Sequence, residues 1–169
     1  ILIDEFKVEA VINTGIAGSL NADINIGDIV ISTDLVHHDM NAVAFGYPVG
    51  QVPQMDAFSF ESDEALRKIA VKACKDVNPD IEVYEGRIAS GDQFVADQAV
   101  KDRIVKDFGA YAVEMEGAAI AHTAYLNHIP FLVVRAISDK ADGSAEMDYP
   151  TFEAMAAEHS VKMTLRILK

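Results

Sequence analysis

The chain has 169 residues and a formal net charge of -13 at pH 7, and 50% of its residues are hydrophobic. This length and apolar content predict a single domain over residues 1–169 with a substantial core, and they argue against disorder. The negative charge argues against nucleic acid or an anionic membrane as a partner, because both attract basic surfaces.

Cysteine usage and the apolar runs set two further limits. Cys74 is the only cysteine, so no internal disulfide can form, and together with six methionines it suits a reducing cytoplasm. No apolar run reaches the roughly 20 residues of a membrane-spanning helix, and no signal peptide is recognisable. These features predict a cytoplasmic protein.

The start of the sequence is unusual. Residues 1–6 carry apolar side chains at helical spacing with no capping residue before them. This pattern predicts the tail of a helix whose beginning is absent, so we expect the domain to be incomplete at its N-terminus.

The rest of the chain alternates between strand and helix patterns. Runs rich in β-branched residues predict strands at 8–15, 29–39, 81–92, 109–116 and from Pro130 onward. Apolar side chains at helical spacing predict helices at 62–77, 97–107, 117–128 and 150–168. Residues 16–28 are rich in turn formers, and residues 40–55 predict a long irregular connection of the kind that serves function or an interface. The alternation predicts an α/β fold with a mixed, largely parallel central sheet flanked by helices.

Four predicted strands end in distinctive segments, at Gly15–Gly18, Ser90–Asp92, Glu114–Glu116 and Ser138–Asp139. In open α/β sheets, ligands bind beyond the carboxyl ends of the strands. For the first two segments a structural role is at least as well supported. The glycines fit a turn without the lysine of a Walker loop, and Asp92 fits a turn cap.

The carboxylates of the other two segments are harder to explain structurally. Glu114 and Glu116 point the same way along an extended segment, and helix-dipole complementarity accounts for one of them better than for both. Asp139 alone fits an N-cap or an Asx-turn as well as a ligand. Because neighbouring strand ends bring these carboxylates over one edge of the sheet, we predict acid/base chemistry on a polyhydroxylated ligand.

The histidines and the cysteine do not indicate a metal site or a covalent nucleophile. His37 and His38 are adjacent and face opposite sides of a strand, with no third ligand at helical spacing. His122 and His128 are too far apart on their helix to act as a pair. No Gly-x-Ser-x-Gly motif is present, and Cys74 falls in mid-helix. We expect no metal and no cofactor.

Six motifs together resemble a known family: "INTGIAG", "GDIVIS", "HHDMNAVAFGYPVGQVPQM", "ASGDQFV", "AVEMEGAAIAH" and "PFLVVRAISDKAD". Their order and spacing resemble bacterial 5′-methylthioadenosine/S-adenosylhomocysteine nucleosidases, of the purine nucleoside phosphorylase superfamily, from about residue 8 to the C-terminus. The resemblance implies a three-layer nucleoside-phosphorylase-like sandwich. It also implies a homodimer that hydrolyses an adenine nucleoside in methionine salvage.

The resemblance assigns several residues to the purine. Asp139 matches the aspartate that hydrogen-bonds adenine and protonates its N7 atom, and Ser138 orients that carboxyl group. Phe94 matches the aromatic residue that stacks on the base, and Val95 contributes backbone contacts. Tyr149 falls where the family has a phenylalanine on the far side of the base.

Other residues are assigned to the sugar and its thioether substituent. Glu116 matches the glutamate that binds the ribose hydroxyls, and Met115 packs under the sugar. Phe45 and Pro53 match loop residues that reach into the neighbouring subunit to cover the alkylthio group.

The same chemistry follows from the reaction itself. Cleavage of an N-glycosidic bond develops positive charge on the sugar, which an ionised Glu116 would stabilise. Adenine leaves badly as an anion, so Asp139 must carry a proton at neutral pH, which a dry pocket or the bound base would favour.

The sequence departs from the family pattern at two points. No residue matches the glutamate that activates water, which family members carry in an upstream segment. Ile16 stands where many members have a serine near the sugar, beside Ala17 and Gly18, which we also expect to contact substrate.

Two alternatives remain open. A phosphorolytic nucleoside phosphorylase needs arginines around phosphate, and none of the five arginines, at 67, 87, 103, 135 and 166, follows a glycine loop at a strand end. A nucleoside-binding module without catalysis would keep affinity for adenine nucleosides without turning them over.

Overall fold

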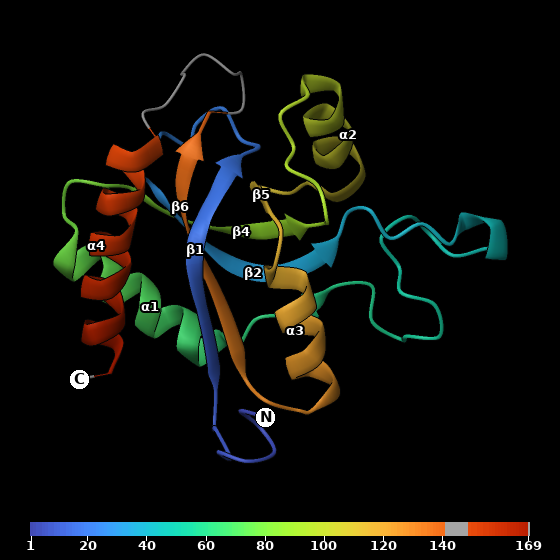
Figure 1. Ribbon diagram of the computed structural model, residues 1–169, viewed down its shortest axis with the longest axis horizontal. Helices are drawn as coiled ribbons and strands as arrows, with labels where there is room; N and C mark the ends of the chain where they lie inside the picture. Colours follow the sequence, from blue (N-terminus) through green and yellow to red (C-terminus); the bar gives the residue numbers. More distant parts are fainter. Residues whose placement is uncertain (141–148, 169) are drawn as a thin grey trace.

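In the computed structural model, which describes residues 1–140 and 149–168, one sheet is covered by helices on several sides (Figure 1). The strands are β1 (Val11–Ser19), β2 (Ile29–His37), β3 (Phe60–Glu61), β4 (Val83–Ser90), β5 (Ala112–Glu114) and β6 (Phe131–Asp139). The helices are α1 (Glu64–Val77), α2 (Gln98–Phe108), α3 (Gly117–Leu126) and α4 (Tyr149–Ile167), with a short 3-10 helix, η1, at Val43–Phe45.

The sheet is mixed and has the order β3-β2-β4-β5-β1-β6. The two longest ladders, β1 with β6 and β2 with β4, are parallel. A further antiparallel pairing joins β2 to β6, so the sheet curls and closes on itself. The predicted α/β class with a mixed sheet between helices is therefore confirmed.

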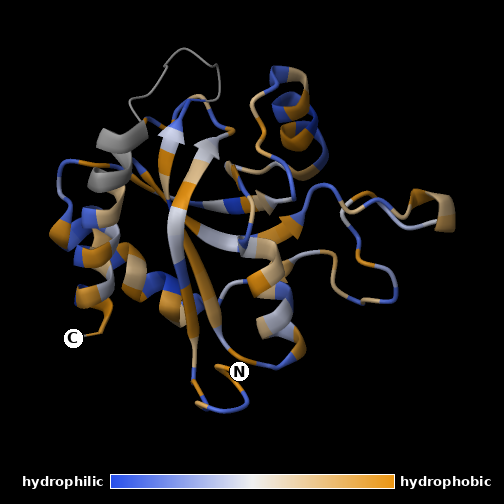
Figure 2. Cartoon of the chain, viewed as in Figure 1, coloured by the Kyte–Doolittle hydropathy of each residue, from blue (hydrophilic) through white to orange (hydrophobic). Residues whose placement is uncertain are grey.

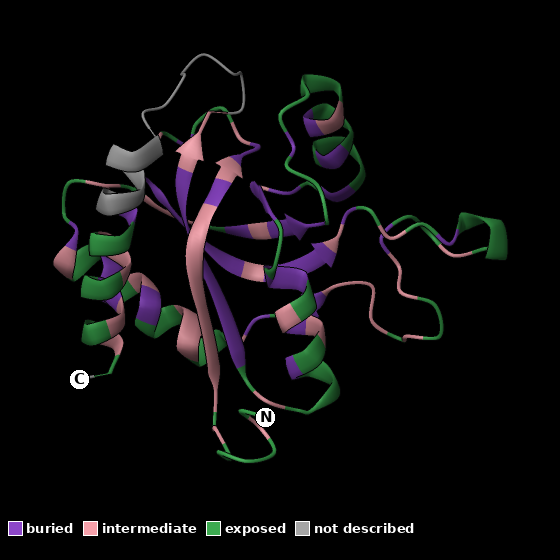
Figure 3. Ribbon diagram, viewed as in Figure 1, coloured by how far each residue is buried: buried purple, intermediate pink, exposed green. Residues whose placement is uncertain are grey.

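Strand β6 lies at the centre of the core, and both of its faces are buried. Phe131, Val133 and Ile137 pack in one cluster with the small residues of α3, and Leu132 and Val134 pack in a second cluster with α1 and α4. Figures 2 and 3 show the result, since β6 is both apolar and buried along most of its length. A strand that is covered on both faces needs an unbroken apolar run, which is why "PFLVV" carries no alternating polar residues.

Capping residues set the helix ends close to the predicted positions. The Asp63 side chain accepts a hydrogen bond from the Leu66 N–H at 2.9 Å and starts α1. Asp97 accepts from Ala99 N–H at 2.8 Å and starts α2, which ends at Gly109 in the left-handed conformation. These are the ordinary start and stop signals of helices.

Two predictions about the N-terminal part are wrong. Residues 2–6 form turns and not a helix, although Glu5 N–H does donate to the Ile1 carbonyl at 2.8 Å. The glycines at positions 15 and 18 do not make a turn, because β1 runs through both of them to Ser19. The reason lies in their neighbours on β6, which occupy the space that their side chains would fill.

The connection between β2 and β3 is long and largely irregular, as predicted, and extends away from the body of the molecule (Figure 1). Two glycines in it have positive φ angles, Gly46 at 85° and Gly50 at 90°. Their surroundings differ. A Cβ atom at Gly46 would meet nothing within 4 Å, whereas one at Gly50 would lie 2.6 Å from the Phe108 ring and 3.0 Å from the His37 carbonyl oxygen.

These two glycines form a matched pair for a stability test. Gly46→Ala should lower the free energy of unfolding by about 1 kcal/mol, which is the cost of the left-handed backbone alone. Gly50→Ala should lower it by about 2–4 kcal/mol, because it adds a clash between the base of the loop and the end of α2. Urea denaturation of both variants measures the difference, and equal losses would contradict the packing described here.

Candidate active site

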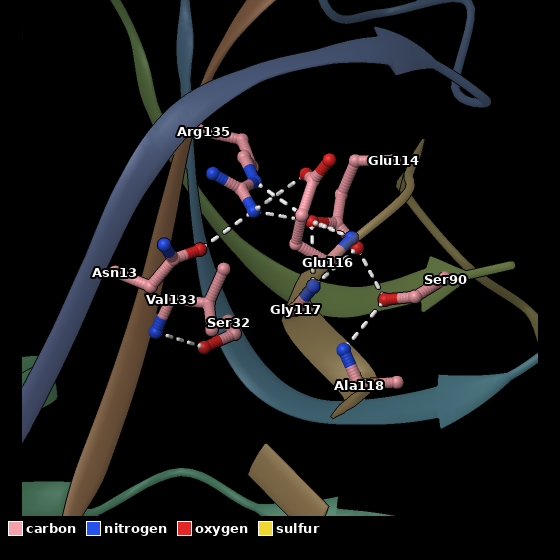
Figure 4. A network of polar contacts seen from close by, with 9 residues as sticks. All are labelled: Asn13, Ser32, Ser90, Glu114, Glu116, Gly117, Ala118, Val133 and Arg135. Carbon is pink, nitrogen blue, oxygen red and sulfur yellow. Dashed lines mark hydrogen bonds and ion pairs between the residues drawn. The ribbon is translucent and has the colours of Figure 1, made fainter. Parts of the chain in front are cut away.

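An ion pair inside the sheet organises the first part of the site (Figure 4). The guanidinium group of Arg135 on β6 pairs with the carboxylate of Glu114 at the end of β5, and both side chains are at most 3% exposed. The Arg135 Nε atom donates to Glu114 Oε2 at 3.1 Å, and Arg135 Nη2 donates to Asn13 Oδ1 on β1 at 2.6 Å. Three strands are thus joined through one side chain.

Gly15 makes room for this arginine. It lies opposite Arg135 in the parallel β1–β6 ladder, and a Cβ atom there would collide with the guanidinium group. This glycine therefore serves close approach within a strand, which explains why the turn prediction was wrong.

Glu114 also holds the start of α3. Its carboxylate accepts hydrogen bonds from Gly117 N–H at 2.8 Å and from Glu116 N–H at 3.2 Å, and Ser90 donates to it while accepting from Ala118 N–H at 2.7 Å. A negative charge at a helix N-terminus is favourable, because the free N–H groups and the helix dipole point toward it. Glu114 is thus the carboxylate that the helix dipole explains.

Glu116 is different, although it lies only two residues further on. Its side chain is 65% exposed, and its carboxylate comes within 3.7 Å of Arg135 Nη2 without replacing Glu114 there. Figure 4 shows both carboxylates directed toward the same guanidinium group. The two glutamates therefore point the same way, as predicted. The Glu114 carboxylate is already bonded to Arg135 and to the start of α3, whereas the exposed Glu116 carboxylate is available to a ligand.

The second part of the site lies at the carboxyl end of β6. Ser138 Oγ lies 3.2 Å from the Ala17 carbonyl oxygen and 2.9 Å from Asp139 Oδ1. Gly18 faces Asp139 in the ladder, and a Cβ atom there would lie 3.1 Å from both carboxylate oxygens. The end of β1 therefore contacts Ser138 and lies so close to the Asp139 carboxylate that a side chain at Gly18 would crowd it.

Lys101 is the residue that the sequence analysis missed. Its Nζ atom donates to Asp139 Oδ2 at 3.1 Å and to the Lys140 carbonyl oxygen at 3.1 Å, and its side chain is only 5% exposed. It shares the buried face of α2 with Ile104 and Phe108. A lysine at this spacing within an apolar stripe was the one signal that could have revealed it.

The other predicted site residues lie in different settings. Phe94 is 81% exposed on the connection from β4 to α2, and the adjacent Val95 is buried. Met115 is 43% exposed between the two glutamates, and Ile16 lies half-buried on β1 next to Ala17. The exposed Phe94 ring and the partly exposed Met115 side chain thus lie close in sequence to Ser90 and to Glu116.

Three predicted residues are not placed at this site by the structure. Phe45 is 84% exposed on η1, and Pro53 is exposed on the same connection between β2 and β3. Tyr149 is the first residue of α4, and its side chain lies outside the described residues.

The two histidines at the end of β2 differ in burial, since His37 ends the strand and is half-buried while His38 follows it and is buried. His38 is fully buried against Gly91, and burial lowers its pKa below the ordinary value. Burial, followed by the proximity of His122, lowers the pKa of His37 as well. Both rings are therefore neutral at pH 7, as expected for imidazoles removed from water.

Within residues 1–140 and 149–168, no group of three or more His, Cys, Asp or Glu side chains is placed to hold a metal ion. A cavity of about 400 Å³ lies away from the strand ends, lined by Lys68, Val71, Lys72, Lys75, Asp76 and Glu85. Among the helices of the described part, none is long and apolar enough to cross a membrane.

Comparison with known proteins identifies the class to which this fold and site belong. A family model described as the phosphorylase superfamily matches residues 1–169. A 5′-methylthioadenosine/S-adenosylhomocysteine nucleosidase from Treponema pallidum is 39% identical to this chain over an alignment of 191 positions. The alignment covers 100% of this chain and 71% of the relative.

Two solved structures share the fold. One is the nucleosidase of the same name from Colwellia psychrerythraea in complex with adenine, with a TM-score of 0.88, 34% identity and coverage of 99% of this chain and 69% of that one. The other is a futalosine hydrolase from Helicobacter pylori, with a TM-score of 0.89, 35% identity and coverage of 99% and 70%. The chain belongs to the 5′-methylthioadenosine/S-adenosylhomocysteine nucleosidase family of the phosphorylase superfamily.

The two glutamates allow a test of their separate roles. Glu114→Gln leaves a buried guanidinium group without its counter-charge and turns amide protons toward the N–H groups of α3. It should lower the free energy of unfolding by about 3–5 kcal/mol. Glu116→Gln, at an exposed position, should change it by less than about 0.5 kcal/mol. Chemical denaturation compares the two, and similar losses would show that Glu114 is not the structural carboxylate.

Proposed function

We propose that this protein hydrolyses the N-glycosidic bond of 5′-methylthioadenosine and S-adenosylhomocysteine and releases adenine. The observation that carries the proposal is the placement of Asp139. In a chain of the nucleosidase family, a half-exposed carboxyl group is held at the end of β6 between Ser138 and the side-chain-free edge of Gly18. Ser138 and Lys101 hold the carboxyl group, and its side chain is 32% exposed, so that a ligand can reach it.

Asp139 acts on the leaving group. Protonated Asp139 gives its proton to adenine N7 as the bond between the base and C1′ breaks, so that adenine leaves as a neutral molecule. Ser138 fixes the direction of the carboxyl group through Oδ1. Phe94 stacks on the base, for which its exposed ring is available, and the Val95 backbone and Tyr149 complete the purine site.

Glu116 acts on the sugar. Its carboxylate accepts hydrogen bonds from the ribose hydroxyls and stabilises the positive charge that develops at C1′, while Met115 packs under the ring. The Arg135 guanidinium group lies 3.7 Å from this carboxylate and attracts it. Ile16, Ala17 and Gly18 line the wall between sugar and base. Water then forms a bond to C1′ through its oxygen and releases one proton to the solvent, because no residue of this sequence matches the family's water-activating glutamate.

The pairing of the arginines supports hydrolysis over phosphorolysis. Among the residues that the structure describes, four of the five arginines pair with carboxylates, in the pairs Arg67–Glu85, Arg87–Asp34, Arg135–Glu114 and Arg166–Asp76. Arg135 is the arginine of these that lies beside the candidate sugar site, and its charge is already balanced by a buried glutamate. A phosphate ion would have to compete with that glutamate.

The decisive experiment measures adenine release from 5′-methylthioadenosine with and without phosphate. We expect equal rates in both buffers, because water and not phosphate is the acceptor.

Asp139→Asn should still bind adenine but should lower kcat by about 100-fold or more, since the amide has no acidic proton to donate. A rate that requires phosphate would identify a phosphorylase. Binding without turnover by the unsubstituted protein would identify a nucleoside-binding module.

We also propose that the protein works as a cytoplasmic homodimer in methionine salvage. The connection between β2 and β3 extends from the body, and its short helix η1 exposes Val43 and Phe45 together, apolar side chains of the kind that an interface covers. In the dimer, Phe45 and Pro53 cover the alkylthio group in the partner's pocket. The free thiol of Cys74 is consistent with the cytoplasm, and cell fractionation tests that location.

The dimer is tested through the exposed ring. Phe45→Ser should raise the KM for 5′-methylthioadenosine and weaken the association of the two subunits. Phe94 is an equally exposed aromatic residue that is assigned to the base, so Phe94→Ser should raise KM and leave the mass of the dimer unchanged. Sedimentation equilibrium gives the mass, and a monomeric unsubstituted protein would contradict this arrangement.

A further inference from the structure

The buried ammonium group of Lys101 has a place at the site that the reaction described above does not use. It is a charged side chain on the apolar face of α2, and burial of an ammonium group is unfavourable unless its donors find acceptors. Its acceptors here are Asp139 Oδ2 and the Lys140 carbonyl oxygen, both at 3.1 Å. The contact joins α2 to the end of β6.

Two donors approach Asp139, one at each oxygen of its carboxyl group. The Ser138 hydroxyl donates to Oδ1 at 2.9 Å, and Lys101 approaches Oδ2 at 3.1 Å. Each carboxylate oxygen has two lone-pair directions, so both oxygens keep one direction free for a purine. The Asp139 side chain remains 32% exposed, which leaves an approach for that purine.

The contact between Lys101 and Asp139 is unfavourable to break. If Lys101 released Asp139, this nearly buried ammonium group would keep only the Lys140 carbonyl oxygen as an acceptor among the described residues, and breaking a buried pair is strongly unfavourable. The ammonium group therefore stays beside Oδ2 while the purine is bound.

We propose that Lys101 is a positioning residue for Asp139. It fixes the carboxyl group at the end of β6, and because an ammonium group favours a neighbouring carboxylate, it favours release of the Asp139 proton to the base over its retention. This inference rests on the proposed role of Asp139. In the step concerned, the O–H bond of Asp139 breaks, an N7–H bond forms, and the negative charge that remains on the carboxylate faces the ammonium group. No other reactant is needed.

A double-mutant cycle tests this role. Lys101→Met removes the charge and keeps an apolar side chain beside Ile104 and Phe108. It should lower kcat by about 10- to 100-fold and change KM by less than about 3-fold, because the carboxylate charge develops in the transition state. In the Asp139→Asn background the same substitution should change kcat by less than about 2-fold, because residues that act as a unit are not additive.

Three controls keep the result interpretable. Lys106→Met removes an exposed lysine from the same helix and should leave kcat unchanged. Lys101→Gln keeps a donor without the charge and replaces Lys101→Met in the cycle if the latter fails to fold by thermal denaturation. Rates are measured in single turnovers with enzyme in excess, so that slow variants remain measurable.

The outcomes separate this inference from the proposed function. A fall in kcat that is the same in both backgrounds would assign Lys101 to general stability, and no fall at all would show that it does nothing for the reaction. Either result overturns the inference and leaves the role of Asp139 intact. If Asp139→Asn itself keeps full kcat, or if the unsubstituted protein releases no adenine, both proposals are wrong.

Discussion

The ion pair between Arg135 and Glu114 is the interaction on which the site depends. Burying two charges inside a sheet is costly, and it is tolerated only when each charge is balanced and each polar atom has a partner. Here Glu114 meets the guanidinium group and the N–H groups at the start of α3, and Arg135 also reaches Asn13. The pair thus fixes β1, β5, β6 and the first turn of α3 relative to one another.

The pair also sets the geometry available to a ligand. Glu116 follows Glu114 by two residues and lies 3.7 Å from Arg135, whereas Asp139 lies four residues beyond Arg135 on β6. At about 3.3 Å per residue, four residues of strand separate the backbones of Arg135 and Asp139 by about 13 Å. Glu116 follows β5 at the start of α3, so a nucleoside that contacts both carboxyl groups would reach from the end of β5 to the end of β6.

Much of this could be predicted from the sequence, and the reasons are local. The unbroken apolar run of β6, the aspartates that start α1 and α2, and Gly109 at the end of α2 all act over a few residues. Asp139 and Glu116 could be singled out because polar residues follow strand ends. The glycines of β1 could not be interpreted in this way, because their reason lies across the ladder, in the Arg135 and Asp139 side chains.

The sequence by itself determined the α/β class, the order of most elements and the family, since each depends on periodicity, capping or motifs that neighbouring residues carry. Only the tertiary structure decided which glutamate is structural, why β1 needs glycine, and that Lys101 meets Asp139 across 38 residues of chain. Those features depend on which side chains share a buried volume. Burial and charge balance are properties of the packed molecule, so no local pattern specifies them.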